Sequence, residues 1–334
     1  MSAEIPAGAM RFNSDSQKLE YWNGSAWFQV HTATPNLASA GEATPGARGV
    51  MGGSVPQAAH IDYINISSTG DAIDFGDLTG NECCTAHGVS SSTRGTFPGG
   101  SQFPARQTGI DSITFASTGD AVEYGNLSVG RAESAGISNG TRGIVAGGST
   151  PGGDSNEIDY WTISSGGTAV DWGVNLSDAR ERIGGAVNST TRGLVYGGQS
   201  PAVNTIEFIT MATIGNVTDF GDLPIAGQNV SGGGNVTRGI FSTSETSPYN
   251  KATSYVTIAT TGNAQNFGEL TVARGLSAGV SSPTRLVICG GLTPSASDVM
   301  DYTNILTQGN FVDFGDLSVS RYGLAGVSNA HGGL

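Results

Sequence analysis

The chain has 334 residues, of which only 13% are charged, and its formal net charge is −13. Only two lysines occur, Lys18 and Lys251, so the basic stripe of a nucleic-acid-binding protein is missing and we expect no nucleic-acid partner. The chain opens without a charged segment followed by an apolar one, and nowhere do about 18 apolar residues run together, so we expect neither a signal peptide nor membrane insertion.

Residues 1–36 are predicted to form a small β-meander followed by a linker. Alternating apolar side chains at 9–13, 18–22 and 25–30 favour three strands, and Asn23-Gly24 is a strong signal for a hairpin turn. A meander of this size cannot bury a core of its own. We therefore predict that its apolar side chains attach the chain to a partner surface; these attachment residues are Phe12, Tyr21, Trp22, Trp27 and Phe28.

A unit of 46 to 50 residues recurs six times in the remaining chain, 37–334. One mark of the unit is the sequence Asp-Phe-Gly-Asp-Leu at 74–78, with variants in the other five units. A period of about 40 to 50 residues is typical of β-propeller blades, and kelch-type blades lie at the long end of that range. The 52 glycines keep to the same period, which excludes a collagen-like chain.

Each unit contains four short runs separated by Gly, Asn, Ser or Pro, as a blade of four antiparallel strands requires. The first run is built from small residues, which suits the innermost strand, where bulk would clash. The third run alternates apolar and polar residues, and a Ser-Thr-Gly-Asp sequence or a variant of it then favours a tight turn. The sequence therefore predicts an all-β protein with a six-bladed β-propeller at 37–334.

Two sets of side chains recur in every unit. The aromatic residue of the Asp-Phe-Gly-Asp-Leu sequence is expected in the core between blades, with exposed sugar-stacking rings as the alternative; the set is Phe75, Tyr124, Trp172, Phe220, Phe267 and Phe314. An arginine begins the second run of each unit, and we predict that its guanidinium bridges carbonyl or carboxylate groups between blades as a structural element. This set is Arg48, Arg94, Arg142, Arg192, Arg238 and Arg285.

Acidic residues at equivalent positions leave one metal-binding alternative open. A ring formed by Asp77, Asp222 and Asp316 at a pore mouth would attract Ca²⁺, although ordinary solvation of hairpin ends is the favoured interpretation. The three cysteines fit neither a disulfide framework nor a zinc site. We predict no catalytic, metal or cofactor-binding residue, since the histidines occupy unrelated repeat positions: His31, His60, His87 and His331.

Seven first-strand sequences occur, one more than six blades need. The C-terminal copy at 325–329 closely matches the copy at 278–282, whereas the copy near 37–43 carries Glu42 at an otherwise apolar position. We therefore expect the C-terminal copy to close the ring beside the strand that begins near Gly49. The fifth unit has Ser242-Thr243-Ser244 where the others have a glycine pair, so its loop between the second and third strands is expected to differ.

Two resemblances cover nearly the whole chain. The pattern G-x-x-R-F-N-x-D-x-x-x-L-E-x-x-N-G-x-x-W at 8–27 resembles a short module of bacteriophage tail-fibre and other virion proteins. The phrases Ile-Asp-Tyr at 61–63 and Asp-Phe-Gly-Asp-Leu at 74–78 resemble kelch-like repeats in virion structural proteins of cyanophages. These resemblances imply a phage particle protein that is assembled in the host cytoplasm.

The expected function is that of a non-enzymatic virion structural protein, whose propeller is displayed on a tail, fibre or particle surface for host adsorption. Its expected partners are other virion proteins, copies of itself and a host cell-surface glycan. One alternative is a decoration protein of the capsid or tail that binds no receptor. Another is a glycan depolymerase, which would need two carboxylates about 5 to 9.5 Å apart in a cleft.

Overall fold

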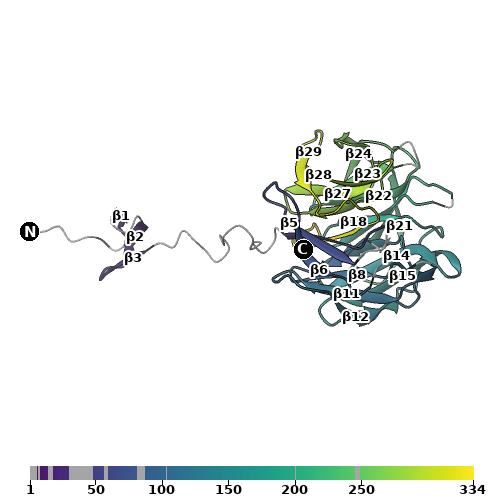
Figure 1. Cartoon of the computed structure of the whole chain (residues 1–334), viewed down its shortest axis with the longest axis horizontal. Coiled ribbons are helices and arrows are strands. Elements are labelled where there is room, and N and C mark those ends of the chain that lie inside the picture. Colours follow the sequence, from purple (N-terminus) through teal and green to yellow (C-terminus); the bar gives the residue numbers. More distant parts are fainter. Residues whose placement is uncertain are drawn as a thin grey trace, which may run out of the picture. The chain divides into compact units, whose positions relative to one another are not determined.

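The computed structural model describes residues 6, 8–13, 18–29, 48–55, 59–80, 87–102, 104–199, 201–244 and 249–334. The chain divides into two compact units, Met1–Thr44 and Pro45–Leu334. In these ranges every regular element is a β-strand, so the protein is all-β as predicted (Figure 1). No helix long and apolar enough to cross a membrane occurs there. The predicted boundary between residues 36 and 37 lies outside the described residues.

The first unit is a three-stranded antiparallel sheet. Its order is β1 (Met10–Asn13), β2 (Lys18–Trp22) and β3 (Trp27–Gln29). The side chain of Asn23 fixes the second turn, because its Oδ1 accepts hydrogen bonds of 2.8 Å from the N–H groups of both Ser25 and Ala26. The three predicted strands are confirmed, but the third begins two residues later than expected because these residues belong to the turn.

The second unit contains six sheets, here numbered sheet 1 to sheet 6; each has four antiparallel strands, and one of them has a fifth strand that pairs in parallel. Sheet 1 is β30 (Ala325–Ser328), β4 (Arg48–Gly52), β5 (His60–Asn65) and β6 (Ile73–Asp77). Sheet 2 is β7 (Val89–Ser90), β8 (Arg94–Pro98), β11 (Gly109–Thr114) and β12 (Val122–Asn126). Sheet 3 is β13 (Ala135–Ser138), β14 (Arg142–Thr150), β15 (Gly153–Thr162) and β17 (Val170–Asp171).

Sheets 4 to 6 repeat this order along the chain. Sheet 4 is β18 (Gly184–Asn188), β19 (Arg192–Tyr196), β20 (Thr205–Thr210) and β21 (Thr218–Asp222). Sheet 5 is β22 (Gln228–Gly234), β23 (Arg238–Ser244), β24 (Ala252–Thr257) and β25 (Gln265–Glu269). Sheet 6 is β26 (Ala278–Ser281), β27 (Arg285–Leu292), β28 (Ala296–Asn304) and β29 (Val312–Asp316). In addition, β16 (Gly167–Thr168) pairs with β12, and β9 (Ser101–Gln102) forms a hairpin with β10 (Ala105–Arg106).

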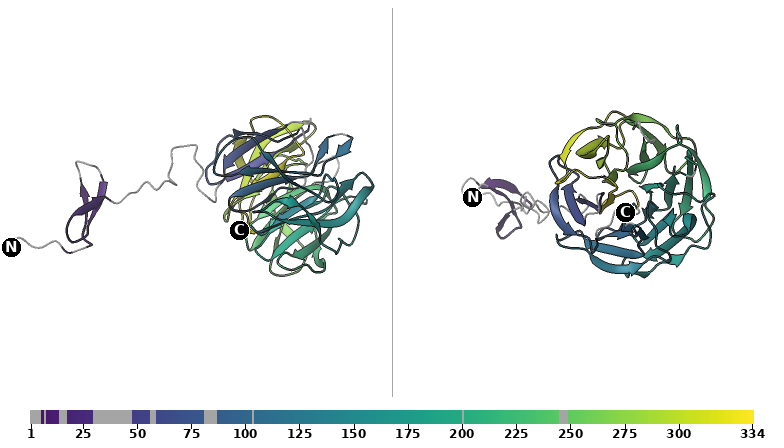
Figure 2. Two further views of the ribbon diagram at one scale, coloured as in Figure 1. Left: turned by 90° about the horizontal axis from the view of Figure 1, so that it is seen from below. Right: turned by 45° about the vertical axis from the view of Figure 1, so that its right-hand side comes forward.

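The first strands of the six sheets form a closed circle. Each contacts the first strand of the next sheet, in the order β7, β13, β18, β22, β26 and β30, and β30 contacts β7 again (Figure 2). Glycines permit this approach: a Cβ atom added to Gly279 would collide with the carbonyl oxygen of Gly232, and one added to Gly136 with that of His87. The small residues predicted for the innermost strands are therefore required by backbone-to-backbone packing.

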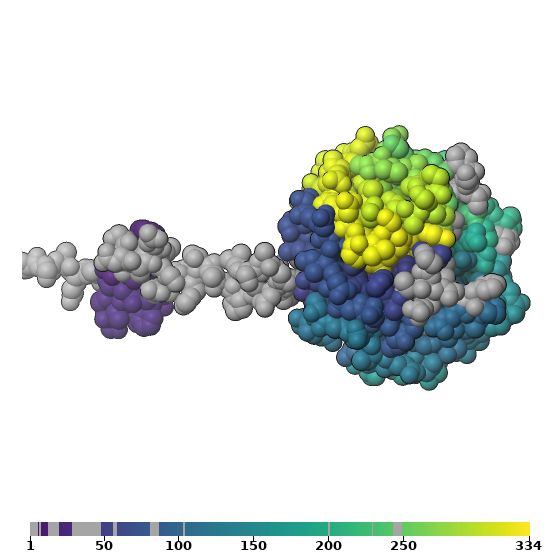
Figure 3. Space-filling view, in the orientation of Figure 1, coloured from purple at the N-terminus to yellow at the C-terminus, as the bar shows by residue number. Residues whose placement is uncertain are grey.

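The C-terminal strand completes the first sheet. β30 pairs antiparallel with β4, with Ala325 opposite Gly52 and Ser328 opposite Gly49. In Figure 3 the C-terminal part of the chain packs directly against the first ring strands. The predicted closure by the C-terminal copy is confirmed, and the competing copy at 37–43 lies outside the described residues.

The core consists of clusters shared between neighbouring sheets. Phe75 of sheet 1, for example, packs in one cluster with Ile113 and Phe115 of sheet 2. The predicted burial of the repeated aromatic side chain is confirmed in five sheets, where it is at most 3% exposed: Phe75, Trp172, Phe220, Phe267 and Phe314. Tyr124 of sheet 2 is only half-buried. Its hydroxyl donates to the carbonyls of Ile163, at 3.1 Å, and Ser164, at 2.8 Å.

At five of the six junctions the outermost strand of one sheet is bonded along its edge to the next sheet. The turn between the third and fourth strands of one sheet bonds to the fourth strand of the preceding sheet, as Gly119 N–H does to the carbonyl of Phe75 at 2.7 Å. Next to it, Ala121 N–H donates to the carbonyl of Asp77, and the Asp120 carboxylate accepts from the N–H of Asp77. These bonds cover an edge that would otherwise pair with another chain.

We predict that Gly76→Ala destabilises the ring more than Gly119→Ala. Both glycines have positive φ angles, 145° and 147°, so both substitutions carry similar backbone strain. A Cβ atom at Gly76 would lie 2.5 Å from backbone atoms of Gly119, whereas one at Gly119 meets nothing within 4 Å. We expect the first variant to lose about 1–3 kcal/mol more unfolding free energy in urea. Equal losses would show that the sheets do not depend on this approach.

Candidate functional site

The six repeat arginines lie in equivalent places at the start of the second strand of each sheet. Arg48 is 4% exposed and the other five are half-buried. In five sheets the guanidinium stacks over an aromatic ring of the third strand, as Arg142 does over Tyr160 with 4.9 Å between the guanidinium carbon and the ring centre. Such a contact stabilises by about 0.5–2 kcal/mol, depending on desolvation.

The same guanidinium groups reach the following sheet. Arg142 Nη1 donates to the carbonyl of Met211 in sheet 4 at 2.8 Å, and Arg48 Nη1 donates to that of Phe115 in sheet 2 at 2.6 Å. Equivalent bonds run from Arg192, Arg238 and Arg285, and the last of these closes the circle at Ile66 and Ser67 of sheet 1. The repeat arginines therefore connect neighbouring sheets through backbone carbonyls.

In sheet 2 a different side chain bonds to the equivalent carbonyl of the following sheet. Its third strand has Ser112 at the position of the aromatic ring, and Arg94 Nη1 donates to the Ser112 hydroxyl at 2.8 Å. The Arg94 guanidinium stacks at 4.2 Å over Tyr124 instead. The hydroxyl of Tyr124 then occupies the carbonyl of Ile163, which corresponds to Met211 in sheet 4. Two residues, Ser112 and Tyr124, have changed together, and the contact between the two sheets is kept.

Of the two kinds of partner predicted for the repeat arginines, backbone carbonyls are the ones that Arg48, Arg142, Arg192, Arg238 and Arg285 bond to. The carboxylates are paired with a second set of arginines, which the sequence analysis missed. These lie in a Leu-Ser/Thr-x-x-Arg sequence directly after the fourth strand and are at most 2% exposed: Arg131, Arg180, Arg274 and Arg321. The partner is the acidic residue in the third strand of the following sheet, respectively Asp159, Glu207, Asp301 and Asp62.

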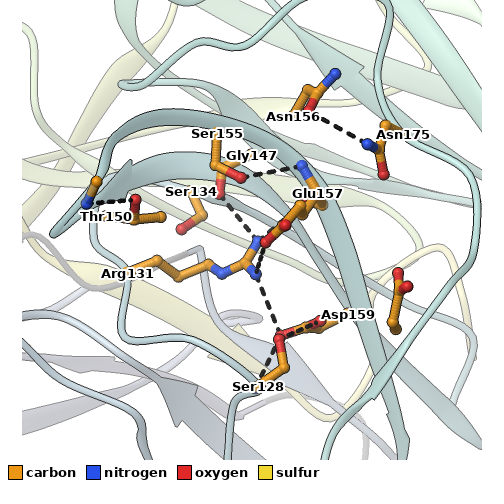
Figure 4. A network of polar contacts seen from close by, with 12 residues as sticks. Ser128, Arg131, Ser134, Gly147, Thr150, Ser155, Asn156, Glu157, Asp159 and Asn175 are labelled. Carbon is orange, nitrogen blue, oxygen red and sulfur yellow. Dashed lines mark hydrogen bonds and ion pairs between the residues drawn. The ribbon is translucent and has the colours of Figure 1, made fainter.

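Figure 4 shows this contact at Arg131. Its Nη2 lies 3.3 Å from Asp159 Oδ2, and its Nη1 donates to the carbonyl of Glu157 at 2.9 Å. Ser128, at the start of the same loop, donates to Asp159 from both its N–H and its hydroxyl. The buried carboxylate of sheet 3 is therefore held by two residues of the loop that leaves sheet 2.

The backbone carbonyl of three of these arginines, Arg131, Arg180 and Arg321, is bonded to the sheet that the chain has just left. Gly100 N–H of sheet 2 donates to the carbonyl of Arg131 at 2.9 Å, and Gly148 N–H of sheet 3 donates to that of Arg180 at the same distance. Gly148 has a φ of 99°, which explains why glycines recur at this position. One arginine thus ties two sheets together, by its carbonyl to one and by its guanidinium to the next. We call this contact the clip.

At two of the six junctions between sheets, another residue stands at the position of the clip arginine. Between sheets 4 and 5 the arginine, the acidic residue and the Ser/Thr donor are replaced together, by Gly227, Ser254 and Pro224. Between sheets 1 and 2 the corresponding position is Glu82, which lies outside the described residues. Asp111 there still accepts two bonds of 2.7 Å from Thr79. The joint replacement avoids a buried carboxylate without its cation, which would be costly.

The alternative of a calcium site at a pore mouth is wrong. Asp77, Asp222 and Asp316 lie in the outermost strands, whereas the circle around the axis is formed by the first strands. Among the described residues there is no group of three or more His, Cys, Asp or Glu side chains that would hold a metal ion. Cys289 is buried, and burial raises its pKa to about 12. Cys83, Cys84 and His31 lie outside the described residues.

The predicted attachment residues divide between the two faces of the first unit. Phe12, Tyr21 and Phe28 share one face with Met10, because Tyr21 lies opposite both Met10 and Phe28 in the register. These four side chains are 42 to 66% exposed. We call this surface the apolar face of the module.

Trp22 and Trp27 lie on the other face and cover one another. Their rings are 5.5 Å apart, and the guanidinium of Arg11 lies 4.2 Å above Trp27. Arg11 is held there by Glu20, with 2.8 Å between Nη2 and Oε2. Both tryptophans are half-buried by contacts within the sheet. Trp22 and Trp27 therefore expose less of their rings than Phe28 does, and their predicted part in attachment stays a prediction.

Comparison with protein-family models and with curated proteins finds no match to this chain.

We predict that Arg142→Ala lowers the unfolding free energy by about 1–3 kcal/mol, because it removes a charge-assisted bond to Met211 and the stacking on Tyr160. Thermal unfolding of the two proteins measures the loss. Arg106→Ala, which removes a half-buried arginine bonded only to the hydroxyls of Ser101 and Ser149, is the matched control and is expected to cost less. An Arg142→Ala protein with an unchanged melting temperature would contradict a structural role for the repeat arginines.

Proposed function

We propose that this chain is a non-enzymatic structural protein of a bacteriophage particle. Its second unit is a six-bladed, kelch-like β-propeller, and its first unit attaches that propeller to a tail, fibre or other part of the particle surface. The displayed ring contacts the host cell. The proposal is supported by the two sequence resemblances, to a tail-fibre module at 8–27 and to kelch-like repeats of virion proteins.

The propeller assignment is supported by the arrangement of the six four-stranded sheets. Their first strands contact one another in a closed circle, and the C-terminal strand completes the sheet that begins at Arg48. Each sheet contributes only part of a buried cluster, so the sheets depend on their neighbours as blades do. Closure by two chain ends in one sheet stabilises such a ring without help from another chain.

The apolar face of the module is the observation that carries the attachment role. Three strands with a hydrophobic face are the least that an independent sheet needs, and Met10, Phe12, Tyr21 and Phe28 expose large apolar side chains on one side. We assign this face to contacts with other virion proteins or with further copies of the chain. An uncovered apolar face of this kind marks an interaction site.

The surface chemistry of the ring suits weak binding to a host glycan. Ser, Thr, Asn and Gly dominate its exposed positions, and charged residues are few. Single contacts of that kind are weak, but a particle that carries many copies converts them into strong adhesion. The buried arginines hold the ring together, which assigns them a structural and not a catalytic role.

We predict that removal of residues 1–44 leaves a folded ring that no longer joins the particle. Phe12→Ser together with Phe28→Ser in the full chain is expected to reduce incorporation about tenfold or more, because it removes large apolar contacts. Ile73→Ser with Val122→Ser is the control, since these side chains are similarly exposed on outer strands of the ring, at 52% and 57%. Incorporation is measured by quantitative mass spectrometry of purified virions.

Normal incorporation of the truncated chain would contradict the attachment role. An unfolded truncated chain would show instead that the first unit belongs to the core of the ring. Virions that lack the ring but adsorb normally would favour a decoration protein over an adhesin.

A further inference from the structure

A cavity lies where the first strands of all six sheets begin. It has a volume of about 50 Å³ and is lined by one or more residues from each sheet, among them His87, Glu133, Arg182, Val230, Leu276 and Leu324. Because these strands form the circle around the ring axis, the cavity lies on that axis. We call it the axial mouth. Successive strands are antiparallel, so the loops between second and third strands open on the same side of the ring.

The axial mouth departs from the sixfold regularity of the ring. One part of its wall is charged: Arg182 Nε lies 3.2 Å from Glu133 Oε2, and Arg182 Nη1 donates to Gln228 Oε1 at 3.2 Å. The rest of the wall includes the apolar side chains of Val230, Leu276 and Leu324. Equivalent positions of the six sheets thus carry charged side chains on one part of the wall and apolar side chains on another.

The charged side chains are held there at the expense of backbone strain. Glu133 and Arg182 have φ angles of 58° and 57°, and Leu276 has 54°, although none of them is glycine. The equivalent residue of sheet 1 is Gly323, with a φ of 70°, which adopts this conformation without strain. Left-handed non-glycine residues are strained and gather at ligand-binding sites. The stability of the ring alone would favour glycine at all of these positions.

The charges in the wall balance one another. Burial raises the pKa of Glu133, and the nearby Arg182 opposes that change. Burial lowers the pKa of His87 below its usual value, and hydrogen bonds to the backbone of Ser134 and Val230 oppose that change only in part. The imidazole is therefore neutral at pH 7. Arg182 also lies 3.9 Å from Glu181. An anionic ligand would meet these carboxylates and a cationic ligand would meet the guanidinium, so the wall favours an uncharged, hydroxyl-rich ligand.

The axis is closed beyond the mouth. His331, in the C-terminal segment, lies among the first strands in a second cavity: its Nε2 is 3.1 Å from the carbonyl of Ser90 and 3.1 Å from the hydroxyl of Ser138. Gly333 N–H donates to the other ring nitrogen, and Figure 2 shows the C-terminus within the ring. A chain cannot thread along the axis, so only the end of a ligand enters the mouth.

We propose that the axial mouth binds the terminal residue of an uncharged glycan. Glu133 accepts a hydroxyl hydrogen of the sugar, Arg182 donates to a neighbouring hydroxyl oxygen, and Leu276 with Leu324 contacts the C–H face of the ring. A cavity of about 50 Å³ holds one edge of a sugar ring. This inference rests on the proposed contact with a host glycan and assigns that contact a place.

The test measures binding of single sugars to the full chain by saturation-transfer NMR. The probes are the methyl glycosides of glucose, galactose, mannose, rhamnose and N-acetylglucosamine, with glucuronic acid and glucosamine as charged counterparts. We expect at least one uncharged glycoside to bind. Glu133→Gln should weaken that binding about tenfold or more, because it removes a charge-assisted hydrogen bond. Leu276→Trp, which fills the mouth and leaves its polar groups in place, should abolish it.

Glu123→Gln is the matched control, because it removes the same charge from an exposed position on an outer strand. It is expected to bind as the unaltered chain does, and melting temperatures identify any variant that fails to fold. The inference would be overturned if none of the uncharged sugars bound, or if only the charged sugars bound. It would also be overturned if the Glu133→Gln and Leu276→Trp proteins bound the sugar as strongly as the unaltered chain does.

Virions carrying Glu133→Gln separate this inference from the adsorption role. If these virions lost sugar binding but adsorbed normally, the axial mouth would be a sugar-binding site that has no role in adsorption. If the unaltered chain bound no sugar but virions without the ring failed to adsorb, the ring would keep its role in adsorption and the sugar site at the axial mouth would be refuted.

Discussion

The clip is the interaction on which the ring depends. A buried guanidinium costs several kcal/mol unless a carboxylate and further acceptors surround it. Arg321 meets this condition only when sheet 1 lies in one register beside sheet 6: its carbonyl accepts from Gly291 of sheet 6, and its guanidinium pairs with Asp62 of sheet 1 at 2.8 Å. Two sheets that slid past one another would leave both charges unpaired. At the four junctions that have it, the clip therefore specifies how one sheet lies beside the next. The apolar and aromatic side chains between sheets supply most of the stabilisation.

Variation among the junctions follows from the same cost. Between sheets 4 and 5 the clip is replaced by uncharged residues, and there Tyr196 packs on Phe241 with 4.3 Å between ring centres, both fully buried. Apolar packing of this kind substitutes for a buried ion pair without loss of stability. The first strands also bring together the Glu133–Arg182 pair, which has no equivalent in the other sheets. The irregularity is thus neutralised at the junction of sheets 4 and 5 and retained at the axial mouth, to which we assign a chemical use.

Much of the fold was predictable because the repeat averages six copies of the same signals. The period, the four short runs and the Gly-containing turns each appear several times, so the strands and the closing role of 325–328 could be predicted from the sequence. The partner of a buried arginine could not, because Arg131 and Asp159 are 28 residues apart in different units and the pairing depends on which sheets are neighbours. The signal was nevertheless present, since Gly227 and Ser254 depart from the pattern together. His87 and His331 seemed unrelated because repeat positions do not reveal that both lie on the axis.

A double-mutant cycle at Arg274 and Asp301 tests the clip most directly, since both side chains are fully buried and lie 2.9 Å apart. Urea unfolding would be compared for the unaltered chain, Arg274→Met, Asp301→Leu and the double variant. Each single change should cost about 3–5 kcal/mol, because it leaves one buried charge unpaired, and the double variant should cost clearly less than the sum of the two. Single variants within about 0.5 kcal/mol of the unaltered chain, or additive losses, would contradict the account that buried arginines fix how the sheets lie beside one another.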